Sequence, residues 1–237
     1  HPFPTRRSSE LDTPGYGNFI AESRGAIRIS DAVGIVISAV SGVEVMTSKS
    51  WDYTEEFGRP RFFIINKMDR ENANFEKSLE SIRENFGREA TPVMLPIGSQ
   101  KDFAGVIDLV HMKAHIYSTD DSGSFKEAPI PDVQKEDAQK KRGELVEMVA
   151  ELDEKLMEKY FESGDLSGEE LEQALRMGIA QHKIYPVLCS AGARNMGSQD
   201  LINFICSFTP SPKDSTAWRA KDHSQQEVDV QCDPGAP

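Results

Sequence analysis

Three short apolar runs, each followed at once by polar residues, restrict the fold of this chain more than any other sequence feature. They are V-G-I-V-I-S-A-V at 33–40, R-F-F-I-I at 61–65 and I-Y-P-V-L at 184–188. Apolar runs of this length are typical of strands buried on both faces, as in a parallel sheet. Because helical patterns lie between the runs, the sequence predicts a doubly wound α/β sheet. Ligands of such sheets bind at the carboxyl ends of the strands.

Apolar residues recur at helical spacing in three segments around these strands, at 43–57, 75–86 and 201–208. Gly58 and Gly87 follow the first two segments, and T-P-S-P follows the third. Residues of these types end helices, so each segment is predicted to be one helix of the main sheet.

The segment between Asp69 and Ser190 is much longer than the few tens of residues that one strand–helix step requires. It has a pattern of its own, which predicts an inserted α+β subdomain at 91–182. Ser167-Gly-Glu-Glu170 is a capping box and begins one of its helices. The other expected elements are short strands at 93–97, 106–110 and 114–117, a polar turn at 118–124, and one long helix through the apolar positions from 145 to 160.

The polar residues after the second run, Asn66-Lys67-Met68-Asp69, have the pattern of a guanine-binding loop. Guanine carries an N1–H and a 2-amine on one edge, and an ionised carboxylate at Asp69 can accept from both. Adenine would leave that carboxylate desolvated and unpaired, which is costly. The stem of Lys67 can lie along the base, while Asn66 ties the loop to its neighbours. The alternative is an ordinary polar loop, which the position after a buried strand disfavours.

A second motif, Asp12-Thr13-Pro14-Gly15, has the pattern of a strand end that faces Mg²⁺ and a γ-phosphate. In P-loop enzymes an aspartate here holds Mg²⁺ through water, and Gly15 lets the backbone turn its N–H toward the phosphate. Alone, this motif is equally well a plain β-turn. A third motif, Ser190-Ala191, follows the last apolar run and would offer a backbone N–H to the guanine O6.

The phosphate-binding loop G-x-x-x-x-G-K-[ST] does not occur in this sequence, and none of its 17 glycines is followed by lysine. That loop and its strand belong N-terminal to Asp12. We therefore expect the chain to be an N-terminally truncated part of a larger GTPase, and inactive by itself. Residues 1–11 lack a starting Met and are predicted to be a non-native leader. The alternative is a natural leader.

Composition narrows the function classes further. The net charge of −12 argues against non-specific binding to nucleic acid, which needs phosphate neutralisation by Lys and Arg. No apolar stretch approaches 18 residues, so no membrane span is predicted. Three cysteines without a C-x-x-C pair fit a reducing compartment, and we expect the cytoplasm. His111 and His115 lie four residues apart without a third ligand, so the sequence does not favour a metal site there.

Taken together, these residues resemble the elongation factor G family, the GTPases that move tRNA and mRNA on bacterial-type ribosomes. The similarity runs from Asp12 to about Pro212. It is most specific in the insertion, at L-P-I-G 95–98, D-F-A-G-V-I-D-L-V 102–110 and M-K-A 112–114. The resemblance implies a P-loop NTPase-type sheet with an inserted subdomain, and GTP hydrolysis that drives translocation. It also implies GTP or GDP and Mg²⁺ as ligands. The implied partners of a monomeric full-length protein are the large-subunit factor-binding region of the ribosome and the tRNA–mRNA complex.

The resemblance also divides the chain. Residues 12–90 and 183–212 would form the GTPase domain, and 91–182 the insertion. Residues 213–237 would be a linker and the start of a following β domain, where Val228 and Val230 alternate like a strand.

The sequence departs from the family pattern at three places. Tyr16 stands where the family has a catalytic His that positions the attacking water, and Asn18 replaces an acidic residue. A phenol is a poor base at neutral pH but can orient a water by hydrogen bonding. The third motif, Cys189-Ser-Ala-Gly192, also differs from the usual Gly-Ser-Ala and a larger residue. The alternative function is therefore a slow- or non-hydrolysing GTP-dependent switch on the ribosome, with a recycling or regulatory role.

Overall fold

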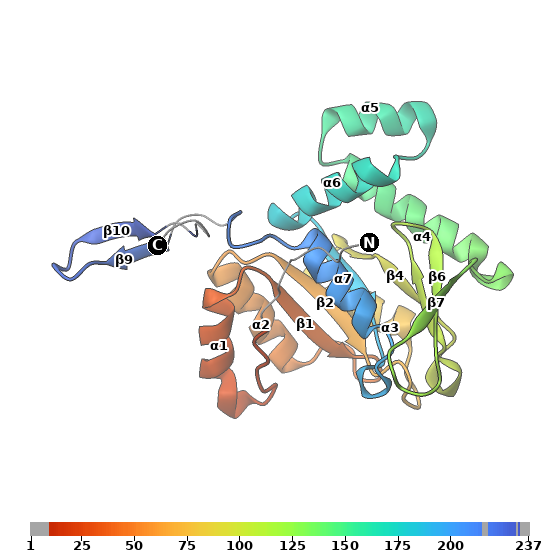
Figure 1. Cartoon of the computed structure of the whole chain (residues 1–237), viewed down its shortest axis with the longest axis horizontal. Helices are drawn as coiled ribbons and strands as arrows, with labels where there is room; N and C mark the ends of the chain where they lie inside the picture. The colour runs from red at the N-terminus through yellow and green to blue at the C-terminus, as the bar shows by residue number, and fades with distance from the viewer. Residues whose placement is uncertain (1–9, 215–217, 231, 233–237) are drawn as a thin grey trace.

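The computed structural model describes residues 10–214, 218–230 and 232, and its centre is a four-stranded sheet. The strands are all parallel and lie in the order β1, β2, β8, β3 (Figure 1). Their bounds are Val33–Ser38, Arg61–Asn66, Tyr185–Cys189 and Ala90–Pro92. The predicted α/β class and the three predicted strands are therefore confirmed. The three-residue strand β3 is too short to leave a pattern in the sequence.

The two central strands and the edge strand β1 differ in burial. Every residue of β2 before Asn66 is buried, as predicted. In β1 burial alternates instead, and the side chain of Val36 is 59% exposed. The prediction that this run is buried on both faces is thus wrong, because β1 has only one neighbouring strand among the described residues and one of its faces lies open.

Helices pack on both faces of the main sheet. Trp51 of α2 (Val45–Glu56) stacks on Phe63 of β2 and on Phe86 of α3 (Phe75–Phe86), so these two helices share one face. Phe62 points to the opposite face because strand side chains alternate, and there it contacts Phe204 of α7 (Ser198–Phe208). Each of these helices matches a prediction, and Gly58 and Gly87 adopt positive φ just beyond α2 and α3.

The first helix, α1 (Ile20–Ile29), was not predicted from the sequence and follows a single 3-10 turn at Gly17–Phe19. It lies beside α2 (Figure 1), where the Arg24 guanidinium pairs with Glu56. Only Ser23 and Ile27 of α1 are buried, and so sparse an apolar face gave no clear helical pattern.

The insertion contains a second four-stranded sheet, which is antiparallel with its strands in chain order. Its strands are β4 Met94–Ile97, β5 Gly105–Asp108, β6 Lys113–Tyr117 and β7 Phe125–Ala128. β3 belongs to the main sheet, so the second sheet starts three residues after the predicted boundary at 91. Buried residues of both sheets form one continuous hydrophobic core. We call residues 94–182 the inserted subdomain.

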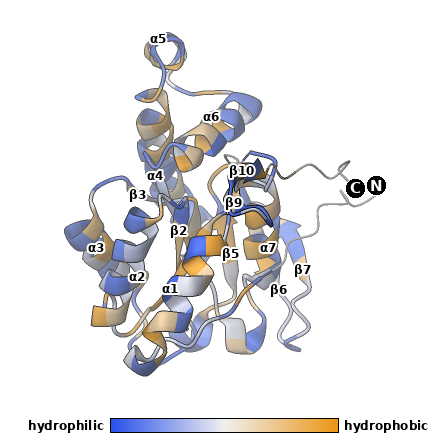
Figure 2. Cartoon of the chain, turned by 90° about the vertical axis from the view of Figure 1, so that its left-hand side faces the viewer, coloured by the Kyte–Doolittle hydropathy of each residue, from blue (hydrophilic) through white to orange (hydrophobic). Residues whose placement is uncertain are grey.

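Three helices cover the inserted subdomain: α4 Asp132–Ala150, α5 Glu154–Ser163 and α6 Gly168–Ala180. Both views show α5 at the top of the molecule, beyond α4 and α6 (Figures 1 and 2). The single long helix predicted from 145 to 160 is in fact two, because the Asp153 side chain accepts from the backbone N–H of Lys155 and Leu156 and starts α5 as its N-cap. The predicted capping box of Ser167 and Glu170 is present. No helix in the described part of the chain is both long and apolar enough to cross a bilayer.

A two-stranded antiparallel hairpin lies near the C-terminus, formed by β9 (Trp218–Lys221) and β10 (Glu227–Val230). The strand-like alternation of Val228 and Val230 is thus confirmed. Every residue of β10 is exposed, so the hairpin packs on no core within the described residues.

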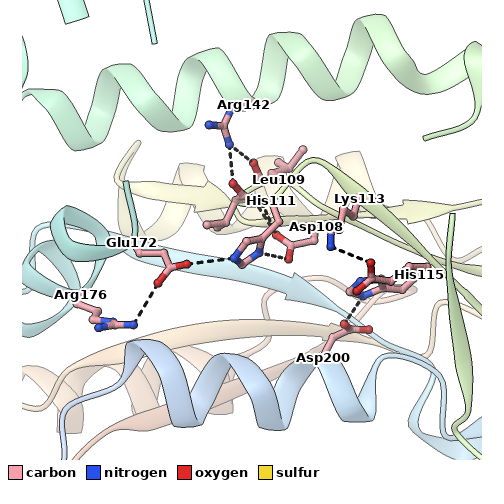
Figure 3. A network of polar contacts seen from close by, with 11 residues as sticks. Asp108, Leu109, His111, Lys113, His115, Arg142, Glu172, Arg176 and Asp200 are labelled. Atoms are coloured by element: carbon pink, nitrogen blue, oxygen red, sulfur yellow. Dashed lines mark hydrogen bonds and ion pairs between the residues drawn. The ribbon is translucent and has the colours of Figure 1, made fainter. Parts of the chain in front are cut away.

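A polar network joins the second sheet to its helices (Figure 3). The His111 ring lies between Asp108, at the end of β5, and Glu172 of α6, with Nδ1–Oδ2 and Nε2–Oε1 distances of 2.6 and 3.1 Å. Arg176 also binds Glu172. Arg142 of α4 donates to the carbonyls of Leu109 and Val110 in the turn that carries His111. Hydrogen bonding to Asp108 and then Glu172 raises the pKa of His111 to about 9.

This raised pKa makes stability depend on pH. Since the folded pKa lies above the ordinary value of 6.5, the ion pairs contribute fully below about pH 6.5, and their contribution is lost as pH rises through 9. His111→Gln should lower the melting temperature by about 2 °C at pH 6 and much less at pH 9.5, since half-exposed pairs are screened. Thermal denaturation across this range measures the difference.

The matched control is His223→Gln on the exposed hairpin, which should leave the pH profile unchanged. An equal loss for His111→Gln at both pH values would show that the ring acts by packing and not by charge. Some pH dependence should remain in the variant, because hydrogen bonding to Asp200 raises the pKa of His115 as well.

Candidate functional site

The second and third sequence motifs meet because their strands are neighbours. β2 and β8 pair in parallel with Ile65 opposite Cys189, so Asn66 and Ser190 leave the sheet side by side. Across this edge the backbone N–H of Met68 donates to the carbonyl of Ser190, with an N–O distance of 3.1 Å. The expected loop at the carboxyl end of the sheet is therefore built from both segments.

Asn66 joins the two loops through its side-chain oxygen. Its Oδ1 accepts from the backbone N–H of Lys67 at 2.7 Å, from the Ser190 hydroxyl at 3.2 Å and from the backbone N–H of Gly192 at 3.0 Å. Lys67 takes a left-handed backbone with φ of 65°. Asn66 thus ties the loop to its neighbours as predicted, whereas Gly192 was not predicted as a partner, because its contribution is a backbone group that no side-chain pattern reveals.

Asp69 carries the feature that points to a ligand. Its Oδ1 is buried and has no hydrogen-bond partner among the described residues. A buried carboxylate oxygen without a donor costs about 1–3 kcal/mol or more. The N1–H and 2-amine of a guanine base are donors of the kind this oxygen lacks, so the residues fit the predicted base. Lys67 is exposed and Met68 is fully buried, which leaves the lysine stem available to the base while the methionine anchors the loop.

The Ser190-Ala191 pair differs from the expectation in one respect. The backbone N–H of Ser190 donates to the carbonyl of Ile65, and that of Ala191 donates to the carbonyl of Met196, both at 2.9 Å. Neither group is free in the described structure to meet guanine O6. An isolated bridge between Ala191 and Met196 closes this loop on itself.

The first motif lies apart from the other two. Asp12, Pro14, Gly15 and Tyr16 are exposed, and Thr13 is half-buried, in an irregular stretch that leads into α1. Ser23 of α1 donates to the carbonyl of Pro14 at 3.4 Å. No hydrogen bond or ion pair between described residues joins this motif to Asn66–Asp69. The Tyr16 side chain is 78% exposed.

No metal-binding cluster accompanies Asp12 among the described residues. Within the described ranges no group of three or more His, Cys, Asp or Glu side chains is placed to hold an ion. His111 and His115 also point to different carboxylates, Asp108 and Asp200. A Mg²⁺ ion at Asp12 would thus need ligands from the nucleotide and water, which this cation commonly uses.

Comparison with known proteins settles the family. The model of the elongation factor Tu GTP binding domain matches residues 4–211. The chain belongs to this GTP-binding domain family. The match begins at residue 4, inside the segment predicted to be a leader, and that assignment stays a prediction.

The most informative relatives are elongation factors G. Those of Thermotoga maritima, Thermotoga neapolitana and Thermotoga petrophila are each 38% identical to this chain over 219 residues, or 91% of it. A crystal structure of a protein from Thermus thermophilus, 36% identical, superposes with a TM-score of 0.78 over 86% of this chain and 30% of its own. The predicted resemblance to elongation factor G is confirmed. This chain spans about a third (32%) of the length of these curated relatives.

Asn66 should hold the loop pair in place without any ligand. Asn66→Ala removes the one acceptor that serves Lys67, Ser190 and Gly192, and we expect a loss of about 2–3 kcal/mol in the free energy of unfolding. Asn66→Asp keeps an oxygen at the same place and should lose much less. Urea denaturation measures both variants, and equal losses would show that the amide oxygen does not organise the loops.

Proposed function

We propose that the protein carrying this chain is a translational GTPase of the elongation factor G type, which binds GTP and GDP and hydrolyses GTP on the ribosome. The observation that supports this most directly is the buried Asp69 oxygen without a donor. It belongs to the loop that Asn66 joins to Ser190 by a hydrogen bond. A polar loop at a strand end with no ligand would satisfy its own carboxylate. Membership of the GTP-binding domain family supports the same nucleotide.

Each predicted site residue has a role in this proposal. Asp69 accepts from the guanine edge, Lys67 lies along the base, and Asn66 and Met68 hold the loop. Ser190 and Ala191 close the other side of the base, after a small change that releases one backbone N–H. Asp12 binds Mg²⁺ through water, and Thr13, Pro14 and Gly15 present backbone to the phosphates. Bound Mg²⁺ would neutralise charge on the phosphate oxygens.

The phosphate side of the pocket needs groups that this sequence does not contain. Affinity in P-loop proteins rests on backbone N–H groups and one lysine around the phosphates, and no glycine–lysine pair occurs here. We therefore propose that the 237-residue chain by itself is inactive. We expect it to bind GTP no tighter than millimolar, on the order of 4 kcal/mol.

The proposed partners follow from the relatives. The protein would act as a cytoplasmic monomer at the large-subunit factor-binding region of the ribosome and move the tRNA–mRNA complex. With a net charge of −12, contact with ribosomal RNA must rest on local basic patches and not on the charge of the chain as a whole.

Base recognition by Asp69 can be tested by changing the base. Asp69→Asn in the full-length protein should lower affinity for GDP and raise affinity for xanthosine diphosphate, about 100-fold in relative preference, since the amide donates where xanthine has a 2-carbonyl. Competition against a fluorescent guanine nucleotide measures the ratio. Asp52→Asn, an exposed change on α2, is the control. Unchanged guanine preference in Asp69→Asn would show that this carboxylate does not read the base.

A second candidate function rests on Tyr16. Its phenol, 78% exposed, stands where the family has a histidine. If the phenol orients the attacking water too poorly, the protein would be a GTP-dependent switch on the ribosome that hydrolyses slowly or not at all.

Ribosome-stimulated GTP turnover separates the two functions. For the hydrolysing factor, the full-length protein should turn over GTP within about threefold of its Tyr16→His variant, since a hydrogen bond suffices to orient the water. Tyr16→Phe removes that hydrogen bond and should be slower than both. A Tyr16→His variant that exceeds the unsubstituted protein by about 100-fold or more would instead establish the slow switch.

A further inference from the structure

The inserted subdomain contacts the Asn66–Asp69 loop through its first connection. After β4 the chain turns at Gly98, with φ of 75°, where an added Cβ would lie 2.0 Å from the carbonyl oxygen of Asp102. This tight turn brings the backbone N–H of Gln100 to the carbonyl of Met68, at 2.8 Å. The inserted subdomain thus holds Met68, the residue next to Asp69, through a backbone hydrogen bond.

The inserted subdomain makes a second contact, with α7, the helix that follows the Ser190-Ala191 loop. Asp200, in the first turn of α7, lies 2.6 Å from His115 Nδ1 and accepts from the Tyr117 hydroxyl (Figure 3 shows His115 and Asp200). His115 and Tyr117 both belong to β6, and all three side chains are at least nine-tenths buried. Burial, followed by the hydrogen bond to Asp200, raises the pKa of Tyr117 above its ordinary value, so the phenol keeps its proton for this bond.

The contact between β6 and α7 extends to the Ser190-Ala191 loop through Gly197. An added Cβ on Gly197 would lie 2.8 Å from the carbonyl oxygen of Cys189, so the glycine packs directly on the Cys189–Ser190 backbone. Gly197 is also the N-cap residue of α7, three positions before Asp200. Tyr117 therefore bonds to the first turn of the helix that begins at the glycine packed against Ser190.

A third contact comes from the polar turn after β6. An added Cβ on Gly123 would lie 2.5 Å from Asn195 Nδ2, and the Arg194 guanidinium faces Asp121 at 3.4 Å. Arg194 and Asn195 are part of the loop that Ala191 and Met196 close.

We propose that the inserted subdomain positions both guanine loops, and that Tyr117 is a positioning residue for base recognition. The inference rests on the proposed function. The second loop contains a single 3-10 turn at Gly192–Arg194, and the Asn66–Asp69 loop contains no helix or strand beyond Asn66. A recognition site nevertheless needs its groups held to about 0.5 Å. The subdomain supplies rigid support to each loop from one antiparallel sheet: Gln100 to the first, and Tyr117 with the 118–124 turn to the second.

The test compares two nucleotides that differ only in the group that Asp69 reads. Inosine diphosphate lacks the 2-amine, so the ratio of GDP to inosine diphosphate affinity reports how well the base edge meets Asp69. In the full-length protein, Tyr117→Phe should lower this ratio at least threefold, because the ring stays and only the hydroxyl contacts are lost. Competition binding gives the ratio, and thermal denaturation gives the stability of each variant.

His111→Gln is the matched control, since it weakens the same subdomain at a place that contacts neither guanine loop. It should lower stability and leave the ratio unchanged. A purely structural role for Tyr117 would give that same pattern, so an unchanged ratio in Tyr117→Phe overturns the proposal even if the melting temperature falls.

If the proposed function itself is wrong, the affinity ratio of the unsubstituted protein shows it. If the unsubstituted protein already binds the two nucleotides equally, Asp69 does not read guanine, and both the proposed function and this inference fail. If Tyr117→Phe does not fold, Asp121→Asn replaces it, because this exposed change removes the charge that faces Arg194 and keeps a residue that tolerates the φ of 58° at this position. A lowered ratio in Asp121→Asn then supports the proposal, and an unchanged ratio overturns it.

Discussion

The parallel pairing of β2 with β8 is the constraint on which the rest of the structure depends. β2 is buried along its whole apolar length, so a slip of its register against β8 would break the packing of Phe63 on Trp51 and of Phe62 on Phe204. That register puts Asn66 beside Ser190, although more than half the chain's length separates them. Asn66 then satisfies a hydroxyl and two backbone N–H groups at once, which turns two strand ends into one loop pair.

The same pairing decides where the inserted subdomain can lie. The chain leaves the main sheet at Pro92 of β3 and returns at Tyr185 of β8, and these two strands are neighbours. An insertion with adjacent ends stays close to the edge it left, and a shared hydrophobic core fixes it there. The loops after β4 and β6 consequently face the carboxyl ends of β2 and β8. This geometry explains how an α+β unit without site motifs of its own contacts Met68, Asn195 and Asp200.

The two halves of the expected nucleotide pocket differ in how the described chain holds them. Around the base, hydrogen bonds and burial order every loop, and the remaining unsatisfied group is an oxygen suited to a ligand. On the expected phosphate side, Asp12, Pro14, Gly15 and Tyr16 lie exposed and Thr13 is half-buried, in the stretch that leads into α1. The carbonyl of Pro14 accepts from Ser23 of α1. In the proposed function, base recognition would therefore rest on the packed core, whereas phosphate contact would depend on a segment that packing barely constrains.

Much of this protein follows from sequence by itself. Buried runs ending in Asn66-Lys67-Met68-Asp69 and Ser190-Ala191 predict the sheet, the base and the carboxylate that reads it, because strand burial and side-chain chemistry are local properties. Capping at Ser167 and the glycines after α2 and α3 are local in the same way. Tertiary structure alone decided the open face of β1, the occupied N–H group of Ser190, and the bonds of Gln100 and Tyr117. Each of these depends on which distant backbone or side-chain group lies opposite, and that is set by the packing of the whole chain and not by any pattern along it.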